Sequence, residues 1–536
     1  MKQAMVNSIL VFAIGVLWLI AICRLIILQV ATWQLKEYRW DRMREYLRLG
    51  STKQVLMSPI ELAKWLLLFL FFAGNTLFGL YSWFVLAIYI LDLLLLVKEL
   101  RRHMIIRPAM TIKAIGMIAI SLSVIFALLG LMFLNGVFIV ATLVFLDRLT
   151  AVIVTTFVFL FFPLSAILKR RKINAAKKLR GGLGQVVVIG ITGSYGKSST
   201  KNILATILDG DNILVTPGNT NTEIGVAQLM LNQLTENINY FVAEMGAYRI
   251  GEIKSLAELV QPKIGILTAV GNQHLGLFGS HENIRKAKSE LIASLPADGT
   301  AILNADDPIC FDISKQITHC EVLTYGLSDE ADLQAKIISS NENGIEVKIF
   351  GLVPETMIVM PVVGQHQLGN VLAGILTAIV LGKKWPEIQL KLQNIRMVKQ
   401  TMEKYTTAQG ALVINDSYNA NVSGVIAAIE NLKSFSQSQK IVILTPMIEL
   451  GSDSATAHEQ VGAVLARVAT RVYYTGTDFK NELLAGAKLV NPDFKIKTQT
   501  QASEIIKDLY PVLGNDAVVL LEGRVPKLIR ESLHTK

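Results

Sequence analysis

The sequence predicts an α-helical transmembrane domain over residues 1–168, followed by two α/β domains. Three observations predict this class. Apolar residues are concentrated before residue 169, and a short apolar run at 186–189 leads into a glycine-rich loop. Strand-like and helix-like segments then alternate to the end of the chain. We therefore expect a P-loop domain with a parallel sheet at 185–397 and a Rossmann-like domain at 398–536.

Composition agrees with a membrane protein. The 536 residues are 52% apolar and 18% charged, with a net charge of +10. The Lys and Arg residues cluster beside apolar runs, which indicates membrane topology rather than nucleic-acid binding. We expect contact with membrane lipid and no nucleic-acid partner. Cys23, Cys310 and Cys320 follow neither a disulfide nor a zinc pattern, which favours a reducing compartment for the soluble part.

The apolar part divides into five expected spans. A span needs about 20 apolar residues. Residues 6–30 make the first and 113–134 the fourth, while 62–98 are long enough for a hairpin of two. The last span is expected at about 149–168, which leaves 136–148 as a re-entrant or interfacial piece.

Basic loops set the expected orientation. Residues 34–53, 98–113 and 169–180 are rich in Lys and Arg, so all three should face the cytoplasm. The expected location is the bacterial plasma (inner) membrane, multi-pass, with the N-terminus outside and the α/β domains in the cytoplasm. Residues 169–184 are expected to be a basic linker at the anionic leaflet.

Charged residues inside the apolar runs leave alternatives open. Arg24 and Asp92 could pair or line a polar path, or both could snorkel toward the cytoplasmic ends of their spans. Asp147 and Arg148 are expected to mark a turn at the outer interface.

The stretch VVVIGITGSYGKSSTKN, residues 186–202, predicts a phosphate-binding loop. Glycines let backbone N–H groups approach phosphates, Lys197 adds a positive charge, and Ser198 can ligate Mg²⁺. The strict motif has Gly where this chain has Ile191, so an ordinary strand-to-helix turn is the alternative. The loop residues expected to bind nucleotide are Thr192, Gly193, Ser194, Gly196, Lys197, Ser198 and Ser199.

Other expected strand ends carry polar residues. The run 240–243 ends at Glu244, a carboxylate that can hold Mg²⁺. The run 264–268 leads to His274, for which a purely structural role is the alternative. A second α/β pattern begins at 411–414, without GxGxxG, and is followed by SYNAN, which alone would be an ordinary turn.

Nine ordered motifs together resemble the Mur ligases over about 185–530. The motifs are TGSYGKSSTK (192–201), GNTNTEIG (218–225), EMGAYRIGEI (244–253), HLGLFGS (274–280), KAKSELIASLP (286–296), LNADD (303–307), GQHQLGNVLAG (364–374), INDSYNAN (414–421) and MIELG (447–451). Within the family, the resemblance is strongest to the branch that adds D-alanyl-D-alanine to a muramoyl tripeptide.

The resemblance implies an ATP-dependent amide ligase that forms ADP and phosphate through an acyl phosphate. Lys197 would steady the γ-phosphate, and Ser198 with Glu244 would hold a first Mg²⁺. His274 would ligate a second Mg²⁺, together with Lys288 in carbamylated form. The resemblance also places Asn370 near adenine, Asp416 at the ribose, and Tyr418, Asn419 and Asn421 in the cleft.

The chain also departs from the family pattern. Membrane spans replace the soluble N-terminal domain that grips the UDP-sugar, which makes a lipid-linked substrate plausible beside a UDP-linked one. An expected Gly-Arg pair is Gln400-Thr401, for which Arg396, Lys399 or Lys404 could substitute. Gly276 stands where the family has an acidic residue, and Gln367 stands where it has an asparagine near adenine. Glu522-Gly523-Arg524 stands where the family has Lys-Gly-Ser-Arg.

Three functions are therefore compared. The first is a membrane-anchored ligase that adds D-alanyl-D-alanine, or another amino acid or dipeptide, to a peptidoglycan stem peptide. The second is a related ligase with another amide product, such as polyglutamate. The third is a non-catalytic, nucleotide-binding scaffold that recruits cell-wall synthesis proteins.

Overall fold

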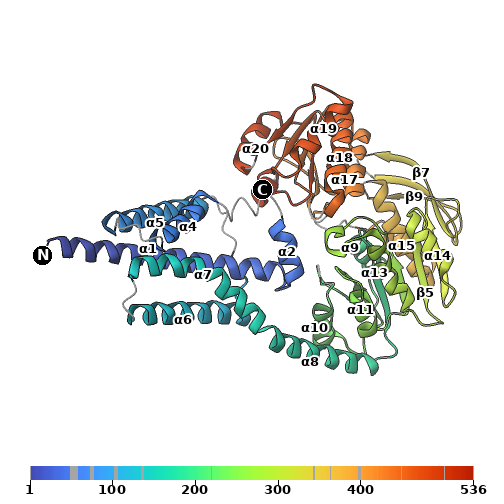
Figure 1. The fold of residues 1–536 in the computed structure, drawn as a ribbon. Coiled ribbons are helices and arrows are strands. Elements are labelled where there is room, and N and C mark those ends of the chain that lie inside the picture. The colour runs from blue at the N-terminus through green and yellow to red at the C-terminus, as the bar shows by residue number, and fades with distance from the viewer. Residues whose placement is uncertain are drawn as a thin grey trace. The chain divides into compact units, whose positions relative to one another are not determined.

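The computed structural model describes residues 2–48, 58–72, 78–101, 107–134, 138–218, 220–341, 344–362, 364–395, 400–418, 420–447, 450–499 and 501–534 (Figure 1). The chain divides into two compact units, residues 1–168 and 169–536. The first is entirely helical in its described part. The second contains two β-sheets with helices packed on them.

Most helices of the first unit are apolar and pack into a bundle. Its helices are α1 (Lys2–Leu35), α2 (Trp40–Arg48), α4 (Pro59–Phe72), α5 (Phe78–Arg101), α6 (Ile112–Leu134) and α7 (Ile139–Leu160), with α8 (Phe162–Gly181) leading out of it. In the described part of the chain, four helical stretches are long and apolar enough to cross a membrane: Met5–Leu35, Leu80–Arg101, Ile112–Leu134 and Ile139–Gly181. The sequence predicted five spans. The difference is α4, whose 14 residues rise only about 21 Å, short of the roughly 30 Å of hydrocarbon.

The expectation of a re-entrant piece at 136–148 is wrong for the residues that the structure describes there. Helix α7 is continuous from Ile139 to Leu160, and Asp147 and Arg148 lie within it rather than at a turn. The Asp147 side chain is 1% exposed. The charge is tolerated inside the helix because Lys64 and Tyr89, from two other helices, and Arg148 beside it are its partners, and the local sequence does not reveal the first two.

Lys64 is the buried centre of an ionic chain in this bundle. Its ammonium lies 2.9 Å from a carboxylate oxygen of Asp92 in α5 and 2.9 Å from one of Asp147 in α7. The Tyr89 hydroxyl also donates to Asp147, at 2.9 Å. Lys64 therefore joins α4 to two neighbouring helices. Because the surroundings are apolar, these charges are neutralised by one another.

Two arginines extend the ionic chain, one at each end. Arg24 of α1 lies 2.8 Å from both Asp92 and Glu99 of α5. Arg148 pairs with Asp147 beside it and with Glu61 of α4. The structure thus shows the pairing alternative for Arg24 and Asp92, and each cation bridges two carboxylates.

The domain that the sequence predicts to bind nucleotide, residues 185–397, is called the nucleotide domain. It contains a nine-stranded sheet in its described residues, in the order β2-β3-β1-β4-β5-β6-β7-β8-β9. Strands β2 to β7 run parallel, and β7, β8 and β9 form an antiparallel extension. The strands are β1 (Val187–Thr192), β2 (Ile213–Val215), β3 (Tyr240–Glu244), β4 (Ile264–Leu267), β5 (Thr300–Asn304), β6 (Glu321–Gly326), β7 (Leu333–Asn341), β8 (Gly344–Gly351) and β9 (Thr356–Met360).

Helices cover both faces of this sheet, each over its own apolar core. One core is made with α10 (Glu223–Gln233), α11 (Glu252–Val260), α13 (His281–Ala293) and α14 (Pro308–Gln316). The other is made with α9 (Lys197–Ile207), α15 (Gln365–Val380) and α16 (Trp385–Leu392). A doubly wound sheet of this kind presents the carboxyl ends of its strands as a binding edge. A short helix, α12 (Leu275–Phe278), precedes α13.

The segment predicted to be a basic linker is helical as far as Gly181. Ile173 and Ala176 of α8 are buried in the first of the two cores. The Arg180 guanidinium donates to the backbone oxygens of Val260, at 2.8 Å, and Val186, at 3.2 Å. This end of α8 is therefore part of the nucleotide domain.

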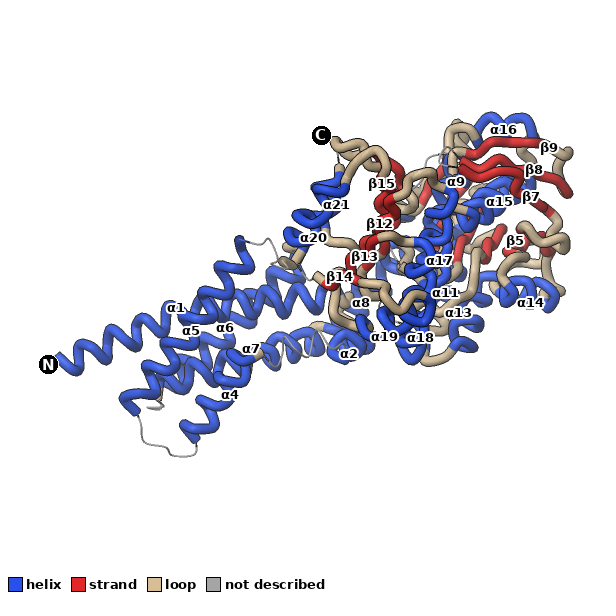
Figure 2. The backbone as a smooth tube through the Cα atoms, turned by 90° about the horizontal axis from the view of Figure 1, so that it is seen from above, coloured by secondary structure: helices blue, strands red, loops and turns tan. Residues whose placement is uncertain are grey.

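In its described residues the C-terminal domain contains a six-stranded sheet in the order β10-β11-β15-β12-β13-β14. Figure 2 labels four of these strands, β12, β13, β14 and β15. All strand pairs are parallel except β10 with β11. The strands are β10 (Glu403–Thr406), β11 (Leu412–Asp416), β12 (Gln439–Leu444), β13 (Arg471–Tyr474), β14 (Ile496–Thr498) and β15 (Ala517–Glu522). Helices α17 (Val422–Asn431), α18 (Ser454–Val468) and α19 (Lys480–Val490) pack on one face, and α20 (Ala502–Leu509) and α21 (Lys527–Leu533) on the other.

The ionic chain predicts a large loss of stability when Lys64 is neutralised. Lys64→Met leaves Asp92 and Asp147 without their shared cation, and removing one partner of a buried pair costs about 3–5 kcal/mol. Thermal unfolding of the full chain in detergent, followed by tryptophan fluorescence, measures the effect. Lys98→Met, at an exposed lysine of α5, is the control. Equal melting of the two variants would contradict a stabilising role for the ionic chain.

Candidate functional site

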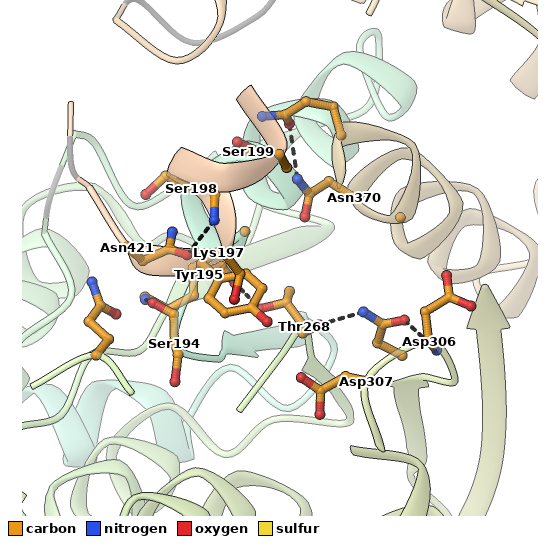
Figure 3. A pocket seen from close by; sticks show the side chains of 18 of the residues that line it. Ser194, Tyr195, Lys197, Ser198, Ser199, Thr268, Asp306, Asp307, Asn370 and Asn421 are labelled. Atoms are coloured by element: carbon orange, nitrogen blue, oxygen red, sulfur yellow. Dashed lines mark hydrogen bonds between the residues drawn. The ribbon is translucent and has the colours of Figure 1, made fainter. Parts of the chain in front are cut away.

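A cavity of about 860 Å³ lies at the carboxyl edge of the nucleotide sheet, between this domain and the C-terminal domain (Figure 3). The predicted site residues that line it are Ser194, Gly196, Lys197, Ser198, Ser199, Asn370, Asp416, Tyr418 and Asn421. The structure therefore brings the glycine loop, α15 and the start of the C-terminal domain to one cavity. Its volume is typical of a small-molecule or cofactor site.

Two glycines of the loop are required by close approach. Gly193 has φ 151°, and a Cβ there would lie 2.0 Å from Thr268 Oγ1. Gly196 has φ 84° and is the N-cap of α9; its Cβ would lie 2.4 Å from Asn370 Oδ1. Neither position accepts a side chain without displacing a neighbour. The loop backbone is thereby wrapped tightly around the N-terminus of α9, as an anion site requires.

Lys197 is folded onto the loop itself. Its ammonium donates to the backbone oxygens of Gly193, at 2.7 Å, and Ser194, at 3.3 Å. Burial lowers the pKa of Lys197, and the nearby Glu244 carboxylate acts in the opposite direction. The lysine thus lies at the cavity wall with carbonyl partners that a phosphate could replace.

The carboxylate of Glu244 is held next to the loop at the end of β3. It is 2% exposed and accepts hydrogen bonds from Ser198 Oγ at 2.9 Å, Lys201 Nζ at 2.8 Å and Asn221 Nδ2 at 3.2 Å. The hydroxyls of Ser198 and Tyr418 are also hydrogen-bonded, which links the C-terminal domain to this point.

These donors fit a magnesium ion. A serine hydroxyl and a carboxylate are hard oxygen ligands, and Mg²⁺ in nucleotide sites takes few protein ligands because phosphates and water supply the rest. No group of three or more His, Cys, Asp or Glu side chains able to hold a metal occurs among the described residues. Ser198 and Glu244 are therefore suited to a metal that arrives with a nucleotide, rather than to a metal held by protein alone.

Two predicted catalytic residues lie outside the cavity lining. Lys288 of α13 is 2% exposed, with its ammonium 6.0 Å from the ring centre of Phe278. Burial, reinforced by the charge of Lys197, lowers the pKa of Lys288 to about 7. His274 is the N-cap of α12 with φ 62°, and its ring lies 4.6 Å from that of Tyr248. Lys288 is thus close enough to Lys197 to be affected by its charge, and the structure brings His274 to Tyr248.

The remaining predicted residues have varied positions. Asn370 is held by Thr200 Oγ1, at 3.2 Å, and by Gln367 Oε1, at 3.0 Å. Thr192 is buried below the loop and donates to the Met245 oxygen at 3.0 Å. Asn421 accepts a hydrogen bond from the Gly424 N–H at 2.8 Å and so caps α17.

The predicted replacement for the missing Gly-Arg pair is only partly described. Arg396 and Lys399 lie outside the described residues, as does Asn419. Lys404 is in β10 and exposed, and it is not among the residues that line the cavity. Thr401, which stands where the arginine was expected, does line it.

Sequence reasoning missed Lys201, Asn221 and Tyr195. Lys201 follows Lys197 by four residues on α9, so helical spacing alone places the two on one face. Asn221 lies in the quoted motif GNTNTEIG, but its contact with Glu244 depends on the fold. Tyr195 lines the cavity from within the loop.

Asp416, which lines the cavity, and Glu522 end neighbouring strands in register. Their side chains are hydrogen-bonded to each other, and Glu522 is 1% exposed with its Oε1 atom lacking a partner within the described structure. Burial raises the pKa of Asp416 to about 7, and burial together with the Asp416 charge raises that of Glu522 well above its ordinary value. The two carboxyl groups therefore share a proton, because both cannot ionise side by side.

Two family models match the second unit. Residues 191–378 match the Mur ligase middle domain, and residues 402–525 match the "Mur ligase, glutamate ligase domain". The matches cover the nucleotide domain from β1 and the C-terminal domain.

Curated relatives match the same region. The UDP-N-acetylmuramoyl-tripeptide--D-alanyl-D-alanine ligase of Escherichia coli K12 is 32% identical over 314 residues, which is 58% of this chain and 69% of the relative. The ligases of the same name from Synechocystis and Bacillus subtilis are 31% and 32% identical, over 52% of this chain in each case. The chain spans about three fifths of the length of these two relatives, 59% and 60%.

Solved structures share the fold. MurF from Thermotoga maritima in complex with ADP has a TM-score of 0.62 at 25% identity, over 68% of this chain and 83% of that one. MurF from Acinetobacter baumannii also has a TM-score of 0.62 at 25% identity, over 68% and 80%. On the sequence match and the shared fold of its two α/β domains, this chain belongs to the Mur ligase family.

Proposed function

We propose that this protein is a membrane-held, ATP-dependent amide ligase that adds D-alanyl-D-alanine to a peptidoglycan stem peptide. One observation carries the proposal: the glycine loop lines the cavity together with Tyr418 and Asp416 of the second domain, and Ser198 of the loop is hydrogen-bonded to Glu244. Lys288 lies outside this lining, but it is close enough to Lys197 for that charge to lower the pKa of Lys288. The relatives from Synechocystis, Bacillus subtilis and Escherichia coli carry the name of a D-alanyl-D-alanine ligase, which supports the choice of substrate.

The chemistry has two steps. An oxygen of the substrate carboxylate attacks the γ-phosphorus of ATP, the bond to the bridging oxygen breaks, and ADP leaves with an acyl phosphate formed. The amine then attacks the acyl carbon, loses a proton, and displaces inorganic phosphate to give the amide. Both steps concentrate negative charge, so fixed cations and N–H groups at the N-terminus of α9 would lower their barriers.

The predicted site residues would each have a part in these steps. Lys197 would exchange its carbonyl partners for phosphate oxygens, and Asn370 and Asp416 would orient adenosine. Ser198 and Glu244 would hold Mg²⁺, which supplies a Lewis acid on the phosphates when bound. A neutral Lys288 amine can attack CO₂, forming an N–C bond and releasing a proton, and the resulting carbamate with His274 would suit a second Mg²⁺.

The domain assignment follows the same proposal. Residues 1–168 would be a multi-pass transmembrane domain and 169–184 a basic segment at the cytoplasmic leaflet. Residues 185–397 would bind ATP, and 398–536 would be a Rossmann-like domain, for which five parallel strands with helices on both faces give support. The location would be the bacterial plasma membrane, with the site in the cytoplasm. The acceptor would be UDP-linked or, given the apolar helices, lipid-linked.

ADP release by the full chain in detergent tests the function. ATP, Mg²⁺ and bicarbonate would be supplied with a UDP-linked or lipid-linked muramoyl tripeptide, with and without D-alanyl-D-alanine. We expect release that requires both partners. Lys288→Ala should lower it by about 100-fold or more, the usual loss when one charge-stabilising group is removed. Lys286→Ala, at an exposed lysine on the same helix, is the matched control.

Other outcomes would replace the proposal. Release that requires glutamate in place of the dipeptide would favour a polyglutamate-type ligase. Nucleotide binding without turnover on any acceptor would favour a scaffold for cell-wall synthesis proteins.

The Asp416–Glu522 pair predicts a pH dependence of stability. Both carboxyl groups ionise near pH 4 when unfolded, whereas the folded pair keeps a proton up to about pH 7. The folded state binds more protons in this window, so the free energy of unfolding falls as pH rises through it. We expect Glu522→Gln to be more stable than the wild type at pH 8, by about 1–3 kcal/mol, with little difference at pH 5.

Calorimetry of the full chain across pH 5–8 measures this dependence. Glu504→Gln, at an exposed glutamate of the same domain, should follow the wild type. A wild type and a Glu522→Gln variant with parallel pH profiles would show that the pair holds no extra proton.

A further inference from the structure

Lys201 is a buried lysine beside the site to which the proposed function assigns no part. It is 1% exposed and lies one helical turn beyond Lys197 on α9. Its ammonium lies 2.8 Å from Glu244 Oε2 and 2.8 Å from the Gly218 backbone oxygen. It therefore joins three segments that are distant in sequence: α9, the end of β3 and the loop that follows β2.

Glu244 depends on the same three segments. Its carboxylate receives hydrogen bonds from Ser198 and Lys201 of α9 and from Asn221 of the loop. Its backbone N–H donates to Thr216 Oγ1 at 3.0 Å. Of these partners, Lys201 alone carries a positive charge, and its side chain and that of Glu244 are each 2% exposed.

The loop after β2 is described at residues 216–218 and 220–222, and the name 216–222 loop refers to these residues. Close packing also fixes it to the strand end. Gly246 donates its N–H to the Asn221 oxygen at 2.9 Å, and a Cβ on Gly246 would lie 2.8 Å from Asn221 Cγ. Lys201, through the Gly218 oxygen, holds the other side of this loop. The position of Asn221 against Glu244 is thus set from two directions.

We propose that Lys201 is a positioning residue for the magnesium site: it holds the Glu244 carboxylate against Ser198 and fixes the 216–222 loop, so that both oxygen ligands are in place before Mg²⁺ and nucleotide arrive. The inference rests on the proposed function, which places Mg²⁺ at Ser198 and Glu244. Groups that orient metal ligands in this way commonly change metal affinity by about 10- to 100-fold when removed.

A purely structural ion pair is the competing explanation, and the two differ in what Lys201→Met changes. A structural role would weaken folding and lower ADP binding with and without Mg²⁺. A positioning role leaves Mg²⁺-free ADP binding intact, since that depends on the glycine loop and Lys197. It raises the Mg²⁺ concentration at the midpoint of Mg²⁺-enhanced ADP binding by about 10- to 100-fold.

The experiment is a titration of Mg²⁺ into the full chain with ADP, read by calorimetry, for four proteins. They are the wild type, Lys201→Met, Glu244→Gln and the double variant. If Lys201 acts through Glu244, Lys201→Met shifts the midpoint strongly in the wild type and by less than about twofold in the Glu244→Gln background. Equal shifts in both backgrounds would overturn the proposal.

Two provisions keep the test decisive. Lys383→Met breaks another ion pair of the same domain, Lys383–Asp211 at 2.8 Å, and should leave the midpoint unchanged. If Lys201→Met alone does not fold, the double variant, which removes both buried charges, is compared with Glu244→Gln, and a large difference between these two overturns the proposal.

Failure of this inference is distinguishable from failure of the proposed function. The readout is binding, so Mg²⁺-dependent ADP binding without ligase turnover would contradict the function and still decide the role of Lys201. A wild type that binds ADP without any Mg²⁺ dependence would overturn both.

Discussion

The buried Glu244 carboxylate is the constraint on which the nucleotide site depends. Strands β1 and β3 pair in parallel with Ile191 opposite Glu244, so the carboxylate lies level with the start of the glycine loop. A charge at 2% exposure requires compensation, and Lys201 with two neutral donors provides it. The glycine loop, α9 and the 216–222 loop are therefore positioned by their contacts with Glu244 and with its partner Lys201.

The helical unit, residues 1–168, also contains buried charges that require partners of opposite sign. Arg24, Lys64 and Arg148 each bridge two carboxylates, so cations and anions alternate along the ionic chain. Among apolar helices no water is available to solvate these charged groups, so each is neutralised by a partner of opposite charge. Helix α4, too short to cross on its own, is thereby tied to α5 and α7.

The sequence was sufficient for features that depend on local pattern. The strand, glycine loop and helix at 186–208 are β1 and α9 in the structure, and nine of the predicted site residues line one cavity. Features that depend on partners distant in sequence could not be predicted from local pattern. Asp147 suggested a turn because its partner Lys64 is 83 residues away, and Lys201 went unassigned because its partner Glu244 is 43 residues away.

His274 illustrates the same limit from the other side. The resemblance indicated a metal ligand there, and the structure gives it a left-handed backbone conformation and a ring 4.6 Å from that of Tyr248, neither of which the local sequence indicates. The Asp416–Glu522 pair could not be predicted from the sequence either, because the two residues are 106 positions apart and meet only through the pairing of β11 with β15.

The most direct test of the account is an isotope transfer. The tripeptide acceptor would carry ¹⁸O in both oxygens of the reacting carboxylate, and the phosphate released by the full chain with ATP and D-alanyl-D-alanine would be examined by mass spectrometry. If the carboxylate attacks the γ-phosphate, one ¹⁸O moves into phosphate for each amide formed. Amide formation with unlabelled phosphate would contradict the account, because the carboxylate would then never have been bonded to phosphorus.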